Sequence, residues 1–498
     1  MRLNDPIKTK LDFHTSLYVS DVKAIAQIFS INCFLSIPQF VEREGNILRQ
    51  CPNMKELVNI GSGKSRGIFK TNDDRSKYLI TIKGSRLKVI TGIRDNNILV
   101  TDIGEIKGEG YVDMAYNGTV IVLIVPNTTG YFIEFTGPDT VTLTEISDGE
   151  FDKYKTAIRS CTFKDGRFVY ATGSQIFIGS LSTDNSGKNF PELSFASAEV
   201  KADANIKLIN YLNLLYIFGE ASIEIFDTAT PIAEIPDNFP FSRTGRGSLN
   251  YGIVGLNNVI LGGESFYFIG WDYNDKNFSL YKGTENSITR ISTDGVDSLF
   301  SELTEIEISE VSAFQYSENG IHFIGWGFPA FAIVYDATNS DVANNIWFHI
   351  RTGESDITPD IFSPYPPLLI RYFEGLIVAM PHNSENLLSI SSTIEENYYA
   401  QLVHHMSRWY TPKVPQYEVT VKSIEFSTDT EIPEIDGGFK IILRGLPVDA
   451  VHESVTLKYT NFSYVYRAGI KCVRQSQVGF YYQSKKRHTV FSGYISYE

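Results

Sequence analysis

Two overlapping stretches near the start of the chain carry the residue types of known reactive loops. Residues 60–65 read Ile-Gly-Ser-Gly-Lys-Ser, similar to a phosphate-binding loop, but that loop needs a glycine where the chain has Val58. Residues 63–67 fit the Gly-x-Ser-x-Gly pattern of a nucleophile elbow, in which a helix must follow the serine. Here Ile68 and Phe69 predict a strand, so we predict a polar, glycine-rich turn without catalytic or nucleotide-binding function.

The histidines and cysteines form no recognisable metal or nucleophile motif. Of the eight histidines only His404 and His405 are adjacent, and adjacent side chains on a strand or helix point apart. Four cysteines are scattered along the chain without zinc spacing: Cys33, Cys51, Cys161 and Cys472. We expect buried, reduced thiols, as in proteins that fold in a cytoplasm. The sequence therefore predicts a protein that is not an enzyme, with no catalytic residue, no metal site and no cofactor.

Charge and composition limit the classes of partner. The chain of 498 residues has 44 Lys and Arg against 58 Asp and Glu, a formal net charge of −14. Such a chain repels phosphate backbones, so we expect no tight binding of nucleic acid. No apolar run reaches membrane-spanning length; a long one begins at Val120 and is stopped by Pro126. We therefore expect no membrane insertion by this chain.

A recurring apolar hairpin is the strongest pattern in the sequence. The 33 Phe and 28 Tyr residues favour strands. The first strands of the hairpins are centred near Leu79, Leu123, Phe168, Tyr216, Tyr267, Phe323 and Ile377. Their spacing of about 44 to 56 residues is close to the length of a propeller blade. We predict an all-β fold containing a β-propeller of about six or seven blades. An irregular array of β-sandwiches with accidental spacing is the alternative.

Three regions are expected along the chain. Residues 1–45 form an N-terminal segment that contacts a partner or closes the propeller. Residues 46–400 form the β-propeller, and residues 401–498 form a separate antiparallel β module, because short alternating strands replace the hairpin repeat there.

Signals for helices and functional loops are few. Apolar residues at helical spacing predict a short surface helix after Asp297 and a second helix between Ile394 and Met406. A loop rich in proline and other turn formers at 352–367 is long enough to have a function.

Short motifs in the first part of the chain occur in an order that resembles one protein family. Among them are residues 66–69 (Arg-Gly-Ile-Phe), 193–199 (Leu-Ser-Phe-Ala-Ser-Ala-Glu) and 239–243 (Phe-Pro-Phe-Ser-Arg). From about Asn46 to Leu303 the chain resembles the packaged-DNA stabilisation proteins of short-tailed bacteriophages, which complete the head and form the tail nozzle. The motif residues that we single out are Arg66, Gly67, Gly118, Gly166, Phe195, Ser197, Glu199, Phe239, Pro240, Phe241, Arg243 and Asp272.

The resemblance implies a structural protein of the virion tail, assembled in the host cytoplasm. Family members look like β-propellers that form a homohexameric ring below the portal and its adaptor ring. Such a ring retains packaged DNA, provides its exit channel without binding it tightly, and presents surfaces to tail needle, fibre or spike proteins. The motif residues would serve the geometry of the fold. Turns are expected at Gly110, Gly118, Gly166 and Gly245, and packing between blades at Phe195, Phe239 and Phe241.

Two other functions stay open at this level. One is a tail-associated propeller that binds a glycan or receptor through exposed aromatic residues, for which the candidates are Trp271, Trp326, Trp347 and Trp409. The other is a propeller glycan hydrolase, which would need clustered carboxylates and arginines in its central channel. Distant loops can assemble such a site, so the sequence leaves both possible.

Overall fold

The structure is a computed structural model that describes residues 7–497 except 12, 14–17, 20–26, 37–46, 72–77, 94–96, 137–139, 180–187, 189, 191–194, 198–202, 230–238, 273–276, 286, 302, 329–331, 341–344, 351–367, 374–375, 383, 392–400, 411–417, 433–437, 447–449, 455–456, 474 and 485–487. The predicted functional loop at 352–367 and the motif residue Glu199 lie outside the described residues.

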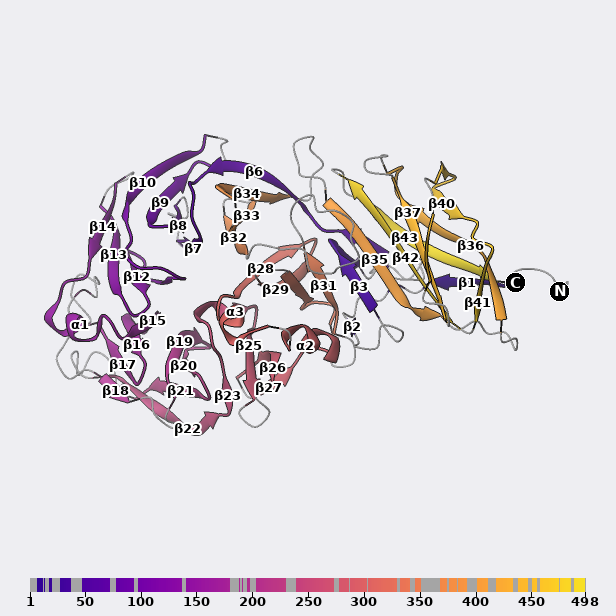
Figure 1. The fold of residues 1–498 in the computed structure, drawn as a ribbon. Coiled ribbons are helices and arrows are strands. Elements are labelled where there is room, and N and C mark those ends of the chain that lie inside the picture. Colours follow the sequence, from indigo (N-terminus) through magenta and orange to yellow (C-terminus); the bar gives the residue numbers. More distant parts are fainter. Residues whose placement is uncertain are drawn as a thin grey trace.

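Seven antiparallel sheets follow one another around a ring and form the blades of a propeller (Figure 1). Blade 1 contains β7 (Ser65–Lys70), β8 (Leu79–Lys83), β9 (Arg86–Thr91) and β10 (Leu99–Glu105). Blade 2 contains β11 (Asp113–Tyr116), β12 (Val120–Val125), β13 (Thr129–Phe135) and β14 (Val141–Glu145). Blade 3 contains β15 (Ile158–Lys164), β16 (Arg167–Thr172), β17 (Gln175–Ile178) and β18 (Phe195–Ser197). Blade 4 contains β19 (Asn205–Tyr211), β20 (Leu214–Gly219), β21 (Ile223–Thr228) and β22 (Phe241–Leu249).

The remaining blades complete the ring. Blade 5 contains β23 (Tyr251–Gly252), β24 (Val259–Gly262), β25 (Ser265–Asp272), β26 (Phe278–Gly283) and β27 (Ile288–Arg290). Blade 6 contains β28 (Ser312–Glu318), β29 (Ile321–Gly327), β30 (Ala332–Asp336) and β31 (Trp347–Ile350). Blade 7 contains β32 (Leu368–Phe373), β33 (Leu376–Pro381) and β34 (Asn386–Ser391), and its fourth strand is β6 (Asn53–Asn59), which precedes blade 1 in the sequence.

The hairpin repeat of the sequence corresponds to these blades. Each predicted strand centre lies at the second position in the strand order of its sheet: β8, β12, β16, β20, β25, β29 and β33. These strands are largely apolar and buried because neighbouring blades cover both faces; all six residues of β12 are buried. Tight turns join the strands. Asp165 and Gly166 both have positive φ, 48° and 78°, which suits the two-residue turn between β15 and β16. The prediction of an all-β propeller is confirmed.

The ring closes between blades 7 and 1 through a strand from the N-terminal part of the chain. β6 pairs with β34 in antiparallel register, with Val58 opposite Leu387. The chain then passes into blade 1, and the Ile60 N–H donates to the Glu385 carbonyl at 2.8 Å. A blade built from both ends of the repeat leaves no open end in the ring.

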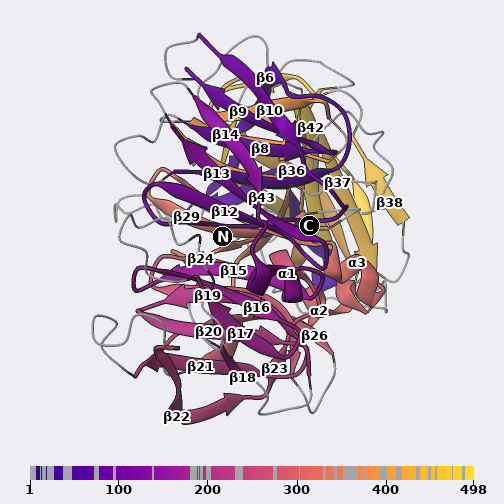
Figure 2. The ribbon, with the colours of Figure 1, turned by 90° about the vertical axis from the view of Figure 1, so that its left-hand side faces the viewer.

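Beside the propeller, two sheets pack face to face in a sandwich. One contains β36 (Glu418–Thr428), β39 (Tyr459–Thr460), β40 (Ser463–Tyr466), β41 (Ile470–Val473), β43 (Thr489–Tyr497), β1 (Ile7–Leu11), β4 (Cys33–Ser36) and β5 (Ile47–Gln50). The other contains β35 (Gln401–Tyr410), β37 (Lys440–Leu446), β38 (Ala450–Glu453), β42 (Gln475–Ser484), β2 (Tyr18–Val19) and β3 (Gln27–Ile31). Their common core contains Val421, Ile441 and Phe480. Figure 2 shows these strands, in yellow, behind the blades.

The N-terminal segment joins the sandwich to the propeller. β1 pairs with β43, and β3 pairs with both β35 and β31, so the sheet of blade 6 continues into the sandwich. The division of the chain into regions 1–45, 46–400 and 401–498 remains a prediction. Hydrogen-bonded sheets cross both of its boundaries.

Helices are short and lie between strands: α1 (Gly149–Tyr154), the 3-10 turn η1 (Leu256–Asn258), α2 (Asp294–Phe300) and α3 (Glu305–Ser309). The helix predicted after Asp297 is instead two helices, because Thr293 and Thr304 each accept hydrogen bonds at a helix N-terminus and start a new one. The second predicted helix is wrong where it is described. Leu402 and Met406 lie in β35, which β3 and β42 pair from both sides, so sheet pairing overrides the helical spacing.

Candidate functional site

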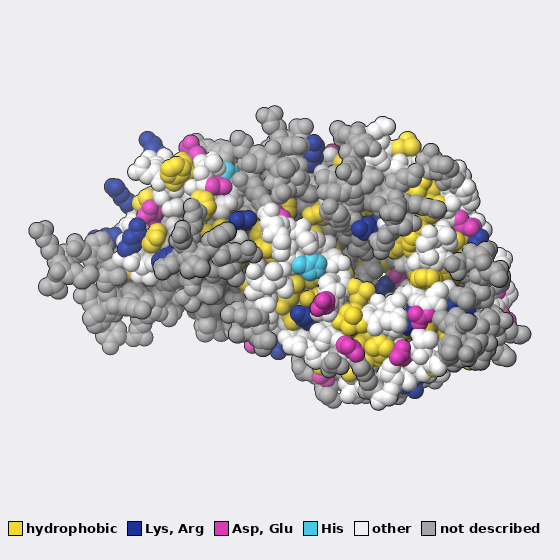
Figure 3. All heavy atoms as spheres, turned by 180° about the vertical axis from the view of Figure 1, so that it is seen from behind, with side chains coloured by type: hydrophobic (Ala, Val, Ile, Leu, Met, Phe, Trp, Pro, Cys, Tyr) yellow, Lys and Arg dark blue, Asp and Glu magenta, His cyan; other side chains and the backbone are white. Residues whose placement is uncertain are grey.

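A cavity of about 760 Å³ lies along the axis of the propeller. The first strands of six blades line it, β7, β11, β15, β19, β24 and β28, so these strands are the innermost of their blades. Its charged residues include Lys70, Asp113 and Lys207. Charges of both signs therefore line the cavity. On the face of the molecule that Figure 3 shows, positive, negative and hydrophobic side chains are likewise interspersed.

A chain of hydrogen bonds joins three innermost strands across this cavity. Lys207 Nζ, in blade 4, donates to Asp113 Oδ1 at 2.5 Å in blade 2. The other Asp113 oxygen accepts from the Ser160 hydroxyl and, at 3.1 Å, from the Cys161 N–H, both in blade 3. Ser160 Oγ in turn accepts the Leu208 N–H of blade 4 at 2.9 Å. Since a buried carboxylate needs partners, this network serves the seams between blades.

The other reactive groups of the cavity are arranged for structure. His322 Nδ1 lies 3.0 Å from the Ser317 hydroxyl, its partner on the neighbouring strand. Burial lowers the pKa of His322, and no carboxylate of the described residues forms a hydrogen bond with its ring. Burial also raises the pKa of Cys161 well above its usual value, with a smaller contribution from Asp113, so the thiol is protonated and a poor nucleophile.

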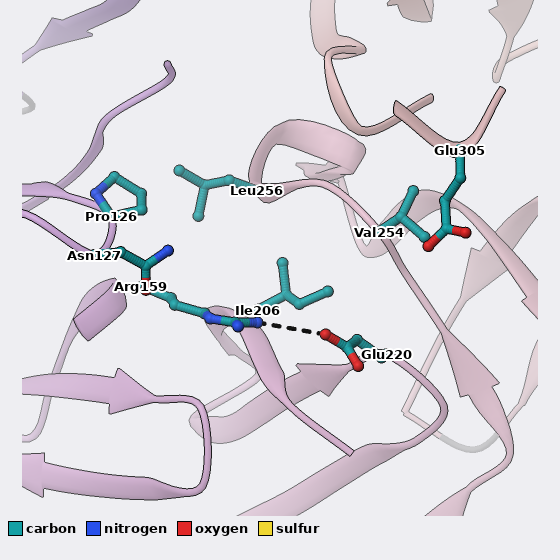
Figure 4. Close-up of a pocket in the computed structure, with 8 residues that line it drawn as sticks. All are labelled: Pro126, Asn127, Arg159, Ile206, Glu220, Val254, Leu256 and Glu305. Carbon is teal, nitrogen blue, oxygen red and sulfur yellow. Dashed lines mark ion pairs between the residues drawn. The ribbon is translucent and has the colours of Figure 1, made fainter. Parts of the chain in front are cut away.

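A smaller hollow of about 210 Å³ lies where β15 and β19 begin (Figure 4). Arg159 Nη1 lies 3.5 Å from Glu220 Oε1 across it, and Glu305 of α3 lies at its other side. Both members of the ion pair are partly exposed, so water screens their interaction. The hollow is thus a surface feature between blades.

The seam between blades 7 and 1 contains the serine of the Gly-x-Ser-x-Gly pattern. Ser65 is 1% exposed, and its hydroxyl donates to the Pro381 carbonyl at 3.0 Å. Lys83 Nζ donates to the same carbonyl at 3.0 Å, to Ser65 Oγ at 3.2 Å and to the His382 carbonyl at 3.4 Å. Residues 61–64 form a turn and β7 follows, as the sequence predicts. Ser65 and Lys83 therefore fasten the first blade to the last.

Replacing Lys83 with methionine should change how stability depends on pH. Burial lowers the pKa of Lys83 to about 8, from 10.5 in an unfolded chain, while Glu385 opposes the shift. Between these two pH values the folded protein binds fewer protons than the unfolded protein, so this lysine makes stability rise with pH. We expect the free energy of unfolding of the wild type, minus that of Lys83→Met, to grow between pH 8 and pH 10. Urea unfolding of both proteins at several pH values measures this difference. If their free energies of unfolding change in parallel with pH, the lowered pKa of Lys83 is contradicted.

Arg66 and Gly67 fasten blade 1 to the connection that enters blade 2. The Arg66 guanidinium donates to the carbonyls of Gly110 at 2.8 Å, Lys107 at 3.1 Å, Gly84 at 3.2 Å and Ile106 at 3.4 Å. A Cβ atom on Gly67 would lie 2.6 Å from a Val112 methyl group, so only glycine fits there.

Among the predicted turn glycines, Gly110, Gly118 and Gly166 have positive φ, as a turn role requires. Gly245 lies inside β22, so its predicted turn role is wrong.

The three motif phenylalanines lie in two different places. Phe241 is buried, Phe239 packs against it with ring centroids 5.5 Å apart, and both join the cluster between blades 3 and 4. Phe195 lies in the outermost strand β18 and is 41% exposed, so it does not fill the space between blades. Ser197 in the same strand is also exposed. An outermost strand has no further strand to cover its side chains.

The remaining motif residues lie in blades 4 and 5. Arg243 pairs with the buried Glu224 at 2.7 Å and lies over the Phe226 ring. The Pro240 carbonyl accepts the Ala229 N–H, and Asp272 ends β25. The motif residues are therefore spread over several blades and do not meet at one site.

Sequence reasoning missed Lys83 and Lys207 as seam residues. A signal existed for Lys83, because it ends a strand whose five residues are all buried. A lysine in such a strand must find partners.

The tryptophans do not form an exposed binding surface in the described part of the chain. Trp326 and Trp347 are fully buried, and their ring N–H groups donate to the carbonyls of Asn258 and Ile291. Trp271 stacks on Phe278. The side chain of Trp409 lies outside the described residues.

Metal ligands and membrane-spanning helices are the remaining features to consider in the described residues. Where residues are described, no group of three His, Cys, Asp or Glu side chains is placed to hold a metal ion. Cys33, Cys51 and Cys161 are buried thiols. The helices of the described ranges are not long and apolar enough to span a membrane.

Comparisons with known proteins identify one matching family. Residues 26–394 match the family model described as "Bacteriophage P22 Gp10, beta-propeller". A search of curated proteins gave no match. Among solved structures, a chain from the S. cerevisiae complex of Dbp5 with Nup159, Gle1, IP6 and ADP matches with 11% identity and a TM-score of 0.38. The match covers 73% of this chain and 98% of that one, and the score is too low to support any inference.

Proposed function

Because the chain belongs to the phage stabilisation family of the bacteriophage P22 Gp10 β-propeller, and is thus a structural phage protein for DNA stabilisation, we propose that its copies form a nozzle ring that retains the packaged genome and bounds its exit channel. The ring is a homohexamer attached below the portal and its adaptor ring. It assembles in the host cytoplasm and presents surfaces to tail needle, fibre or spike proteins.

The size of the propeller cavity is the observation that supports a channel between copies. A cube of 760 Å³ has an edge of about 9 Å, whereas the major groove of duplex DNA alone is about 12 Å wide. A cavity of that size does not admit duplex DNA along one propeller, and Asp113 and Lys207, which line it, form an ion pair with each other. A conduit for the genome therefore needs several copies around it.

The distribution of charge supports a wall along which DNA slides. Residues 46–400 carry 27 Lys and Arg against 44 Asp and Glu, a net charge of −17, while residues 401–498 carry 12 against 9, a net charge of +3. Each cation that touches a phosphate strengthens salt-dependent binding and would slow the DNA. Acidic residues of the propeller should therefore face the channel more often than basic ones.

Particles made without this protein test the proposal. They should assemble heads and portals and package DNA, and then lose most of it, because the exit is unsealed. The measurement is the DNA content of purified particles with and without nuclease treatment. Supplying the chain from a plasmid is the control and should restore retention. Particles that keep their genome but fail to adsorb to cells would favour the glycan- or receptor-binding alternative instead.

A further inference from the structure

Two long blocks of the sequence carry opposite and unmixed charge. Residues 291–350 contain nine Asp and Glu and no Lys or Arg, whereas residues 454–497 contain seven Lys and Arg and no Asp or Glu. The first block includes α2 and α3 of the propeller. The second includes β39 to β43 of the sandwich. Each copy of the chain therefore has an acidic and a basic region on different parts of its fold.

The acidic block exposes a hydrophobic residue at α3. Ile306 is 75% exposed, because it lies two positions before the buried Ile308 and therefore on the opposite side of the helix. Glu305 beside it is exposed and forms no ion pair with any described residue, while Glu310 lies 3.6 Å from Lys64. We refer to Glu305, Ile306 and Glu310 as the acidic corner.

The basic block exposes a hydrophobic hairpin. The turn between β39 and β40 consists of Asn461 and Phe462, with φ of 51° and 60°. Phe462 is 69% exposed and Val465 is 40% exposed. Lys458 and Arg467 on either side are exposed and form no ion pair with described residues. We refer to Lys458, Phe462, Val465 and Arg467 as the basic hairpin.

A bulky residue at Phe462 is unfavourable for the isolated chain. Positive φ suits glycine or asparagine in a two-residue hairpin turn, and a large side chain there strains the backbone. The ring is also largely in water, so it gains little from burial. Strain of this kind is found where a side chain serves recognition, which points to contact with a partner.

We propose that the basic hairpin of one copy docks on the acidic corner of a neighbouring copy. The inference rests on the proposed ring and names the surfaces that would join its subunits. In Figure 1 β40 lies toward the end of the molecule that carries the termini and α3 lies on the propeller, so one copy cannot make this contact with itself. Two different complementary surfaces on one chain give a head-to-tail contact, which closes into a ring when the rotation allows it.

The chemistry of the two surfaces matches. Phe462 and Val465 would cover Ile306, and Lys458 and Arg467 would lie near Glu305. Local charge pairs of opposite sign can steer two copies together despite the net charge of −14 that each one carries.

Cross-linking in purified phage particles tests the contact. In a chain that carries Cys472→Ser, so that the only native thiols are the buried Cys33, Cys51 and Cys161, we would introduce Ile306→Cys and Val465→Cys and add a short bis-maleimide, which reacts with the exposed thiols. A ladder of linked copies is expected from the double variant, and none from either single variant. A ladder from one single variant would show a symmetric contact and overturn the proposal. A general amine cross-linker is applied in parallel. If it links copies while the cysteine pair does not, the ring stands and this contact is wrong; if neither reagent links copies, the ring itself fails.

Three variants in the double-cysteine background identify the forces. Phe462→Gly should reduce the linked product about tenfold or more while leaving the melting temperature unchanged or higher, since glycine fits the positive φ. Glu305→Lys and Arg467→Glu should each reduce it about fivefold. Combining the two charge changes in one chain should restore it, because every contact then carries the reversed pair. A loss of product that persists in the combined variant overturns the pairing.

Discussion

Replacing Arg66 with methionine is expected to lower the free energy of unfolding by about 3–5 kcal/mol. The guanidinium is 3% exposed and satisfies four backbone carbonyls between blades 1 and 2. Methionine has a similar length and no donor, so it leaves these buried acceptors without partners. The loss therefore exceeds the effect of removing one charge from the surface.

Urea unfolding followed by circular dichroism measures this effect. Arg86→Met is the matched control, because Arg86 lies in the same blade and pairs with Asp102 at 2.7 Å but is half exposed. Because water screens that exposed pair, its loss should change stability far less than the loss of the Arg66 network. Arg66→Lys should fall between the two, since an ammonium group cannot reach four carbonyls in a planar arrangement. Equal losses in Arg66→Met and Arg86→Met would show that the network does not stabilise the seam.

The blades could be predicted from the sequence because the information is local. An apolar strand, a tight turn and a second strand recur within a few residues, and period and turn chemistry are both visible in the sequence. Ring closure could not be predicted in this way. β6 pairs with β34, more than 300 positions later, and no local pattern states which distant strand becomes its partner.

The error between Ile394 and Met406 has the same origin. The spacing of apolar residues suits a helix, but in β35 the pairing with β3 and β42 decides the conformation. The seam residues also depend on distant partners. Asp113 and Lys207 are 94 positions apart, and only the arrangement of blades brings them together. Three of the four turn glycines were predictable because glycine readily takes a positive φ, whereas the exposure of Phe195 depends on which strand is outermost.

Replacing Ile60 with alanine is expected to lower the free energy of unfolding by about 2–5 kcal/mol, the range for a buried large-to-small change. Ile60 is 1% exposed and lies where the closing strand enters blade 1. Its side chain joins a cluster with Ile68 and Leu79 of blade 1 and Met380 and Leu387 of blade 7. A cavity there weakens the joint that converts an open row of blades into a ring.

The location of the effect distinguishes a weakened joint from general destabilisation. Hydrogen exchange should accelerate most in β6, β7 and β34, because local opening at the seam exposes their amides. The seam between blades 3 and 4 has its own hydrophobic cluster around Phe241 and should keep its protection. Leu99→Ala, in the outermost strand of blade 1, is the control; Leu99 is 62% exposed, so its loss should change stability by less than about 0.5 kcal/mol. Uniform acceleration across all blades in Ile60→Ala would mean that the ring opens as one unit, and that closure by β6 is not its weakest joint.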